Sequence, residues 1–171
     1  MTEIYLLTRV VHVVLGAFWM GAIVFAAFYL MPAVAEAGPD GAKVMAGIVR
    51  RKYLNVVPLV ALVNILTGFW LYWRFTNGFE PALSGTRGAM VFGTGGVLAL
   101  VAFHIGVLGM RRNILKAGAL AAQAAALPEG GDRAALVAKA VALRARASMY
   151  GPIVAVMLIV TAALMALGHY I

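Results

Sequence analysis

The fold class is set by residues 5–34, which read YLLTRVVHVVLGAFWMGAIVFAAFYLMPAV. A helix needs about 20 apolar residues to cross about 30 Å of hydrocarbon, and this stretch is long enough although it contains Arg9 and His12. Three similar runs follow at about 53–73, 88–110 and 150–169. They are continuous rather than alternating, which excludes a closed barrel. We therefore expect an all-α, polytopic membrane four-helix bundle that occupies residues 1–171 as a single domain.

The composition supports a membrane protein and limits the groups that could bind a metal or carry out catalysis. Hydrophobic residues make up 64% and charged residues 12%, and the mean hydropathy of +0.95 leaves no soluble domain to expect. Without cysteine, any metal or cofactor must be held by histidine, methionine, carboxylate or backbone groups. All six carboxylates fall at span ends or in connections, which argues against hydrolytic catalysis and against an ion-coupled pump. The start of the chain lacks the charged segment of a cleaved signal, so the first span is expected to be retained.

The basic residues predict the orientation. Eleven of the fourteen lie in the connections after the first and third spans: Lys43, Arg50, Arg51, Lys52, Arg111, Arg112, Lys116, Arg133, Lys139, Arg144 and Arg146. By the positive-inside rule these connections face the cytoplasm and both termini lie on the outer side. The expected location is the inner (cytoplasmic) membrane of a bacterium, with the lipid bilayer as the immediate partner. Nucleic acid is not an expected partner, because the charges flank apolar spans and lack aromatic stacking partners.

Both basic connections are predicted to be helical. After a turn at 38–41, a helix is expected from about Gly41 through Lys52 into the second span. The alanine-rich stretch 113–127 favours helix, breaks at 128–131 and resumes after Asp132 as N-cap. The third and fourth helices should therefore extend into the cytoplasm as a hairpin over about 111–149. Glycines in the first and third spans favour close helix packing, with a homo-oligomer or a membrane-complex partner as a further expectation.

Histidines are the candidate site residues, because an ionisable side chain at membrane depth is costly. His12 shares a helix face with Gly16 and Trp19, and the glycine would leave space for something flat. One interpretation makes His12 a ligand of haem iron or copper, since imidazole is the commonest metal ligand. The other makes it a histidine hydrogen-bonded to a neighbouring helix or wetted near the interface.

His104 and His169 have weaker claims. His104 lies deeper, about 10 Å from the inner boundary, and we expect Asn64 and Thr67 to satisfy it unless it binds a cofactor. His169 stands at the outer end of the last span, below a stripe formed by Met157, Thr161 and Met165, which is more typical of bundle filling than of a copper path. An axial offset of roughly 10 to 15 Å between His12 and His104 disfavours a single haem shared by both. Two sites, a different axial partner for each histidine, or a pairing of His12 with His169 stay open.

The first span also resembles known families through His12, Trp19, Gly21, Phe25 and Tyr29 in HVVLGAFWMGAIVFAAFYLMP. It is similar to the opening helix of the copper-resistance D-type membrane proteins and of the four-helix, haem-binding bacterial protoporphyrinogen oxidases. The resemblance implies a helical bundle, and it implies that His12 corresponds to the membrane histidine associated with haem b in the oxidases.

Three functions follow as hypotheses. The first is a small membrane protein that binds haem b through His12, with His104 as second choice, and serves electron transfer or tetrapyrrole chemistry. The second is a non-catalytic membrane subunit or scaffold of a larger complex. The third is a copper-handling protein that uses His12, His169 and the methionine stripe.

Overall fold

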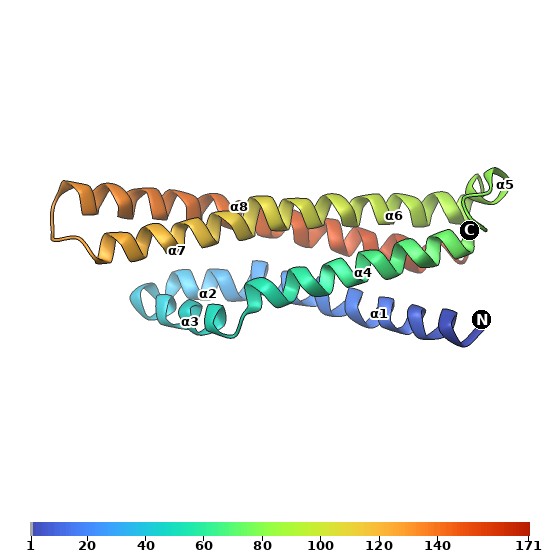
Figure 1. Cartoon of the computed structure of the whole chain (residues 1–171), viewed down its shortest axis with the longest axis horizontal. Helices are drawn as coiled ribbons and strands as arrows, with labels where there is room; N and C mark the ends of the chain where they lie inside the picture. Colours follow the sequence, from blue (N-terminus) through green and yellow to red (C-terminus); the bar gives the residue numbers. More distant parts are fainter. Residues whose placement is uncertain (1) are drawn as a thin grey trace.

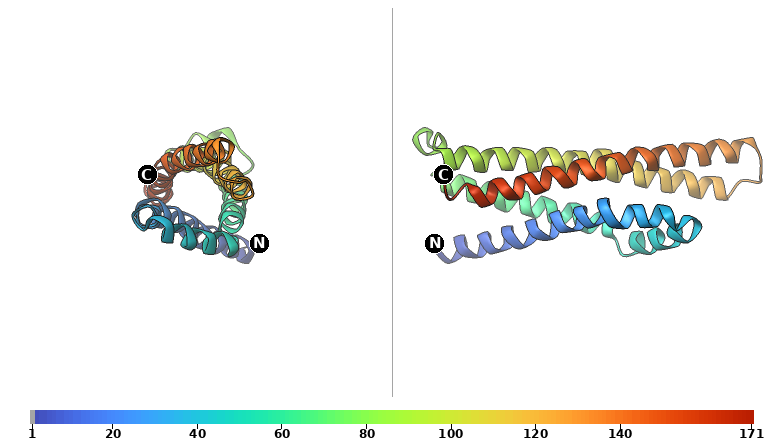
Figure 2. Two further views of the ribbon diagram at one scale, coloured as in Figure 1. Left: turned by 90° about the vertical axis from the view of Figure 1, so that its left-hand side faces the viewer. Right: turned by 180° about the vertical axis from the view of Figure 1, so that it is seen from behind.

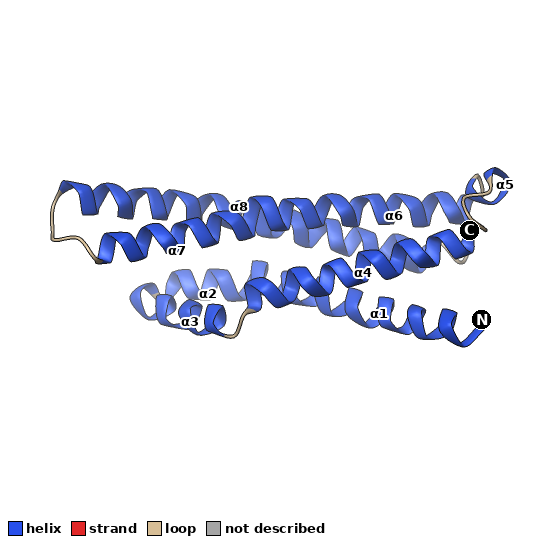
Figure 3. Ribbon diagram, in the orientation of Figure 1, coloured by secondary structure: helices blue, strands red, loops and turns tan. Residues whose placement is uncertain are grey.

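The computed structural model describes residues 2–171, apart from the side chains of Thr2 and Pro39. Within these residues the chain forms helices and turns and no strand, as predicted (Figure 3). The helices are α1 (Thr2–Phe25), η1 (Ala26–Leu30), α2 (Met31–Glu36), α3 (Gly38–Arg50), α4 (Tyr53–Phe75), α5 (Pro81–Ser84), α6 (Arg87–His104), η2 (Ile105–Arg111), α7 (Arg112–Ala125) and α8 (Gly131–Leu167). The segments η1 and η2 are π-helical turns inside otherwise continuous helices.

Four helical stretches are long and apolar enough to cross a membrane, which confirms the predicted number. They cover Glu3–Glu36, Tyr53–Phe75, Arg87–Ala125 and Gly131–Leu167. The first three contain the predicted spans at about 5–34, 53–73 and 88–110, and the fourth covers the predicted span at about 150–169 as far as Leu167. The third and fourth stretches extend well beyond their spans, and these extensions are the helical parts of the basic connection at about 111–149.

The long helices run side by side along one axis, and both termini lie at the same end of the molecule (Figure 1). We call this the terminal end, and we call the opposite end, where α2 joins α3 and α7 joins α8, the basic end. Helix α1 packs along α4, and α6 packs along α8. At the basic end two separate hairpins project, α2–α3 and the longer α7–α8 (Figures 1 and 2).

The core of the bundle is apolar and consists of small and branched side chains around one tryptophan. Its buried members are Trp19, Ile23, Val57, Ala61, Ala99, Ala102, Val154, Ala155 and Leu158. All four long helices contribute to this cluster. Trp19 is only 4% exposed and meets the ring of Phe103 edge-on, with 6.5 Å between the ring centroids.

The α7–α8 hairpin is joined by alanines. Ala117 and Ala124 on α7 and Ala140 and Ala147 on α8 are buried, and each pair is seven residues apart. A spacing of seven keeps small side chains on one seam between two helices. The hairpin is therefore a close antiparallel pair without large side chains between its axes.

Two predictions about helix ends are wrong. No continuous helix runs from Gly41 into α4: α3 ends at Arg50, Lys52 takes the left-handed conformation at φ 59°, and α4 begins at Tyr53. The reversal of the chain lies earlier, between α2 and α3, where α3 folds back on α2 and a Cβ at Gly41 would stand too close to the carbonyl of Val34. Asp132 is not the N-cap of α8; Gly130 holds that position, and Asp132 lies in the first turn.

Candidate functional site

His12 lies half-buried between α1 and α4, about midway along their contact. The two helices are also joined by the rings of Tyr5 and Trp70, 6.3 Å apart, and by the Tyr53 hydroxyl, which donates to the carbonyl oxygen of Ala22 at 2.9 Å. These contacts on either side of His12 hold α1 in register against α4. The register brings the imidazole onto residues 64–68.

The imidazole of His12 is held by α4 through one nitrogen. Its Nδ1 lies 2.9 Å from the carbonyl oxygen of Asn64 and 3.3 Å from the hydroxyl oxygen of Thr67. A carbonyl oxygen only accepts, so Nδ1 carries the proton and donates it. The Thr67 hydroxyl donates to the carbonyls of Val63 or Asn64, both at 2.9 Å, and therefore also acts as an acceptor toward His12.

The second nitrogen of His12 remains free. Within residues 2–171, Nε2 has no hydrogen-bond partner, and the fully buried side-chain atoms that lack a partner are Asn64 Oδ1, Ser84 Oγ and Thr161 Oγ1. Nε2 therefore reaches accessible surface. With Nδ1 protonated and bound, Nε2 presents the lone pair that a metal or an external donor would use.

Two glycines shape the surroundings of His12. A Cβ at Gly68 would stand 2.6 Å from Cε1 of the imidazole, so the ring lies directly against the backbone of α4. A Cβ at Gly16 would stand 3.3 Å from Oδ1 of Asn64, whose side chain is buried. The expectation that Gly16 leaves space for a flat group is therefore wrong, because the Asn64 amide fills that space.

His104 has a different environment from the one predicted. Its Nδ1 donates to the carbonyl oxygen of Leu100 in the same helix at 2.8 Å, and the side chain lies exposed on the outer surface of the bundle. Asn64 and Thr67, expected as its partners, contact His12 instead. The orientation of α6 about its own axis explains the different partners, because it directs His104 away from α4.

The structure does not bring the three histidines together. Trp19 and Phe103 lie at one depth, and His12 precedes Trp19 by seven residues, so His12 and His104 differ in depth by about 10 Å. His169 at the terminal end accepts from the Arg9 guanidinium through Nε2 at 3.1 Å and meets the ring of Phe92. Arg9 thus occupies Nε2 of His169. Across the part of the chain that the structure describes, no three His, Asp or Glu side chains gather as a metal site.

The methionine stripe fills the bundle. Met157 packs against the buried core, and the methyl carbon of Met165 lies against Gly95 of α6. Thr161 between them is one of the residues whose buried hydroxyl has no partner. The stripe therefore serves helix packing, which is the interpretation that its spacing favours.

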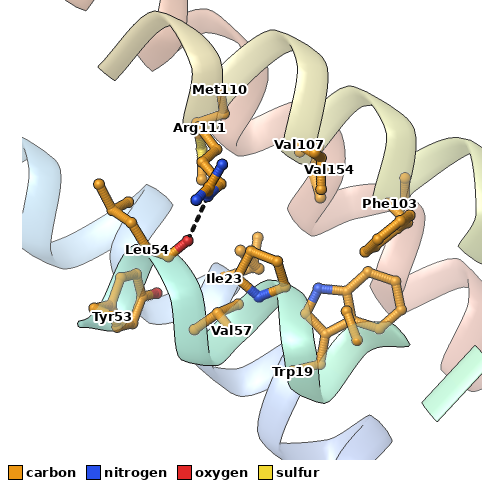
Figure 4. A pocket seen from close by; sticks show the side chains of 14 residues that line it. Trp19, Ile23, Tyr53, Leu54, Val57, Phe103, Val107, Met110, Arg111 and Val154 are labelled. Atoms are coloured by element: carbon orange, nitrogen blue, oxygen red, sulfur yellow. Dashed lines mark hydrogen bonds between the residues drawn. The ribbon is translucent and has the colours of Figure 1, made fainter. Parts of the chain in front are cut away.

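A second feature escaped the sequence analysis: a pocket between all four long helices toward the basic end (Figure 4). Its walls are apolar apart from Arg111, and they include Trp19, Tyr53, Pro58 and Phe103. The π-turn η2 and Pro58 both border it, and such irregularities in helices are frequent at functional sites. None of the three histidines lines it.

Comparison with models of protein families, with characterised proteins and with solved structures finds no match for this chain. The fold and the site therefore show the general class of protein and no particular family. The protein is an all-helical chain with four helices long and apolar enough to span a membrane, and it carries a half-buried histidine with one free nitrogen between the first two of them.

Proposed function

We propose that this chain is a four-span membrane protein that binds haem b through Nε2 of His12 and serves one-electron transfer or tetrapyrrole chemistry. The observation that carries the proposal is the hydrogen bond from Nδ1 to the Asn64 carbonyl, which fixes the ring and its tautomer and leaves Nε2 free. Ligating histidines commonly donate their other N–H to a carbonyl in this way. The resemblance of the first helix to the haem-binding oxidases points to the same residue.

The donor set suits this group. Neutral imidazole is an axial ligand of haem iron, and bound haem would supply the one-electron chemistry that the side chains of this chain lack. Since the Asn64 amide fills the space at Gly16, the haem would approach from the accessible side of Nε2. His104 lies about 10 Å away in depth and on another face, so it is not assigned to the same iron.

The orientation of the protein is part of the proposal. Eleven of the fourteen basic residues belong to the connections at the basic end, so we place that end in the cytoplasm and both termini outside. The inner membrane of a bacterium is the location that fits the resemblance. In this orientation His12 lies in the outer half of the bilayer.

The test is an absorption spectrum of the detergent-purified protein, oxidised and then reduced with dithionite. We expect a Soret band that shifts on reduction, is lost in His12→Ala and is kept in His104→Ala and His169→Ala. The two control variants remove an imidazole of the same chemistry from elsewhere in the chain. A spectrum without a Soret band in the parent protein after haem-supplemented expression, or loss of the band in His104→Ala alone, would contradict the assignment.

One observation favours a second candidate, a subunit of a homo-oligomer or larger membrane complex. His104 lies inside the third span, yet its side chain is exposed and Nε2 has no partner within residues 2–171. Ionisable residues at membrane depth usually face protein or water, so a neighbouring subunit would cover this face of α6. A spectrum without haem, together with a purified particle heavier than one chain, would favour this candidate over the first.

A further inference from the structure

Basic side chains from three separate segments meet where the apolar parts of the long helices end. Arg111 of η2 donates through Nε to the carbonyl oxygen of Leu54 and through Nη2 to Oδ1 of Asn55, both at 2.8 Å (Figure 4 shows the first bond). A Cβ at Gly109 of η2 would stand 3.1 Å from the ring of Tyr150, so α8 passes at the same level. We call the basic residues within four positions of Leu54, Arg111 or Tyr150 the basic collar: Arg50, Arg51, Lys52, Arg111, Arg112 and Arg146.

The carboxylates of the same connections lie away from the collar. Glu36 and Asp40 lie beside the turn between α2 and α3, and Glu129 and Asp132 lie in or beside the turn between α7 and α8, so all four are at the tips of the two hairpins (Figure 1). Helix α3 alone separates Asp40 from the collar by about 15 Å. The ion pairs among the described residues belong to these tips and are Lys43–Asp40 and Arg133–Glu129. The collar therefore carries positive charge that no carboxylate of the described residues balances.

Tyrosines mark where the level of the collar lies relative to lipid. A Cβ at Gly151 would stand 3.4 Å from the Cβ of Ala27, so η1 passes the start of the fourth span at this level. Tyr29 of η1 is exposed, and Tyr53 and Tyr150 are partly exposed at the starts of the second and fourth spans. Tyrosine gathers at the boundary between hydrocarbon and headgroups. The collar is therefore expected at the headgroup level of one leaflet.

Arg111 is the collar residue whose position α4 fixes. Pro58 makes this possible, because it has no N–H to donate to the carbonyl four residues earlier, which is that of Leu54. A guanidinium has five N–H donors, and the bonds to Leu54 and Asn55 use two of them. Arg111 is half-buried, and its other N–H groups have no acceptor within residues 2–171. A held guanidinium with free donors is suited to a phosphate group.

We infer that the basic collar binds the headgroup of an anionic phospholipid, whose phosphate accepts from Arg111 and whose charge is balanced by the exposed collar residues beside it. The acyl chains stay in the bilayer and do not enter the bundle. The charge of the collar fits this occupant, because clusters of Lys and Arg next to membrane spans attract anionic lipids. The inference rests on the chain spanning a bilayer, but it does not depend on haem or on which end of the bundle faces the cytoplasm.

Spin-labelled phospholipids test the inference. The protein is reconstituted in phosphatidylcholine bilayers at about 0.1 M salt, and electron paramagnetic resonance measures the fraction of label that the protein immobilises. The two probes, phosphatidylglycerol and phosphatidylcholine, have the same acyl chains and the same label. We expect phosphatidylglycerol to associate about fivefold more strongly or better, since one cation close to an anionic headgroup gives a preference of about that size.

Matched pairs of substitutions decide whether the collar causes the preference. Arg51→Gln together with Arg112→Gln removes two exposed collar charges, leaves both bonds of Arg111 in place and should lower the preference by about fivefold. Arg133→Gln together with Lys139→Gln removes the same charge from the α7–α8 hairpin. These two residues lie about 16 Å or more along α8 from its apolar part, beyond the screening length of about 10 Å. The control pair should therefore keep the preference.

Arg111→Gln alone should also lower the preference, because the collar then lacks its fixed donor. Equal association of the two lipids with the parent protein overturns the inference and leaves the collar to an acidic protein surface. So does a preference that either collar variant keeps, or one that the collar pair and the control pair lose alike. Absence of immobilised lipid of either kind would contradict the membrane-spanning fold on which the inference rests.

Discussion

At the residue scale, Gly68 is the position on which the His12 site depends most closely. Its missing side chain lets the imidazole lie against the backbone of α4, where Nδ1 reaches the Asn64 carbonyl. His12 provides the candidate ligand, and Gly68 on the neighbouring helix provides the space for its ring. A site of this kind is therefore sensitive to a substitution that adds one carbon atom.

Gly68→Ala should destabilise the protein by about 1 to 3 kcal/mol, because the new Cβ would overlap the imidazole. Unfolding in mixed detergent micelles measures the change. Gly21→Ala is the control: nothing lies within 4 Å of a Cβ there, so relief of glycine's helix penalty should stabilise that variant by about 0.5 to 1 kcal/mol. Equal stability of Gly68→Ala and the parent would show that His12 does not lie as described.

The sequence identified His12 as a candidate, but it did not identify the partners of His12. Asn64 and Thr67 were predicted to contact a histidine, and the histidine that they contact is His12 and not His104. Spacing along one helix shows which residues share a face. It does not show how that face is rotated toward another helix, and this rotation decides which histidine meets α4.

At the element scale, the α7–α8 hairpin depends on small side chains. Its seam holds alanine where soluble antiparallel helices commonly hold leucine, so the two helices approach closely and have little apolar area to bury. Most of their remaining surface is exposed. The stability of the hairpin therefore depends on how closely the seam packs.

Ala140→Leu should disrupt this seam, because a larger side chain at a buried alanine forces the helices apart at a cost of about 1 to 3 kcal/mol. Amide hydrogen exchange over residues 112–147 should then speed up by about tenfold or more. Ala138→Leu adds the same side chain on the exposed face of α8 and should leave exchange unchanged. Similar exchange in the two variants would contradict the packing described for the seam.

The helices themselves were largely predictable, whereas the break between α3 and α4 was not. Long apolar runs and alanine-rich stretches favour helix whatever surrounds them, and Pro128 with its glycines marks the turn before α8. The helix is interrupted at Lys52, a residue that rarely takes positive φ and gives no turn signal. Packing of α3 against α2 selects this conformation, and the residues on either side of Lys52 do not predict that packing.

At the scale of the whole molecule, the distribution of basic residues and the arrangement of the helices lead to one orientation. The connections that hold eleven of the fourteen basic residues lie at one end, and both termini lie at the other. Composition predicted the four spans, and the positive-inside rule supplies the orientation that we propose. The pocket at Arg111 could not be predicted, because it needs residues from four helices that meet only in the fold.

Single cysteines test the orientation directly, because the chain has none of its own. Gly130→Cys, in the turn before α8, should react with a membrane-impermeant maleimide only after the inner membrane is opened. Gly78→Cys, in the turn after α4, should react in intact spheroplasts. The reverse pattern would invert the proposed orientation and place the Arg111 pocket on the outer side.

The π-turn η2 has a consequence for how this chain tolerates changes in length. Each hydrogen-bonded ring of a π-turn holds one residue more than a ring of an α-turn. Loss of a single residue from η2 would allow an unbroken α-helix and leave α7 in its present phase relative to α6, because the wider π-turn absorbs the extra residue. Loss of a single residue from the α-helical part of α6 would instead turn α7 by about 100° relative to the start of α6, since an α-helix completes a circle in 3.6 residues. Ala117 and Ala124 would then point away from α8 although both were unchanged. The π-turn is therefore the place in this long helix where a change of one residue in length would leave the alanine seam of the hairpin in place.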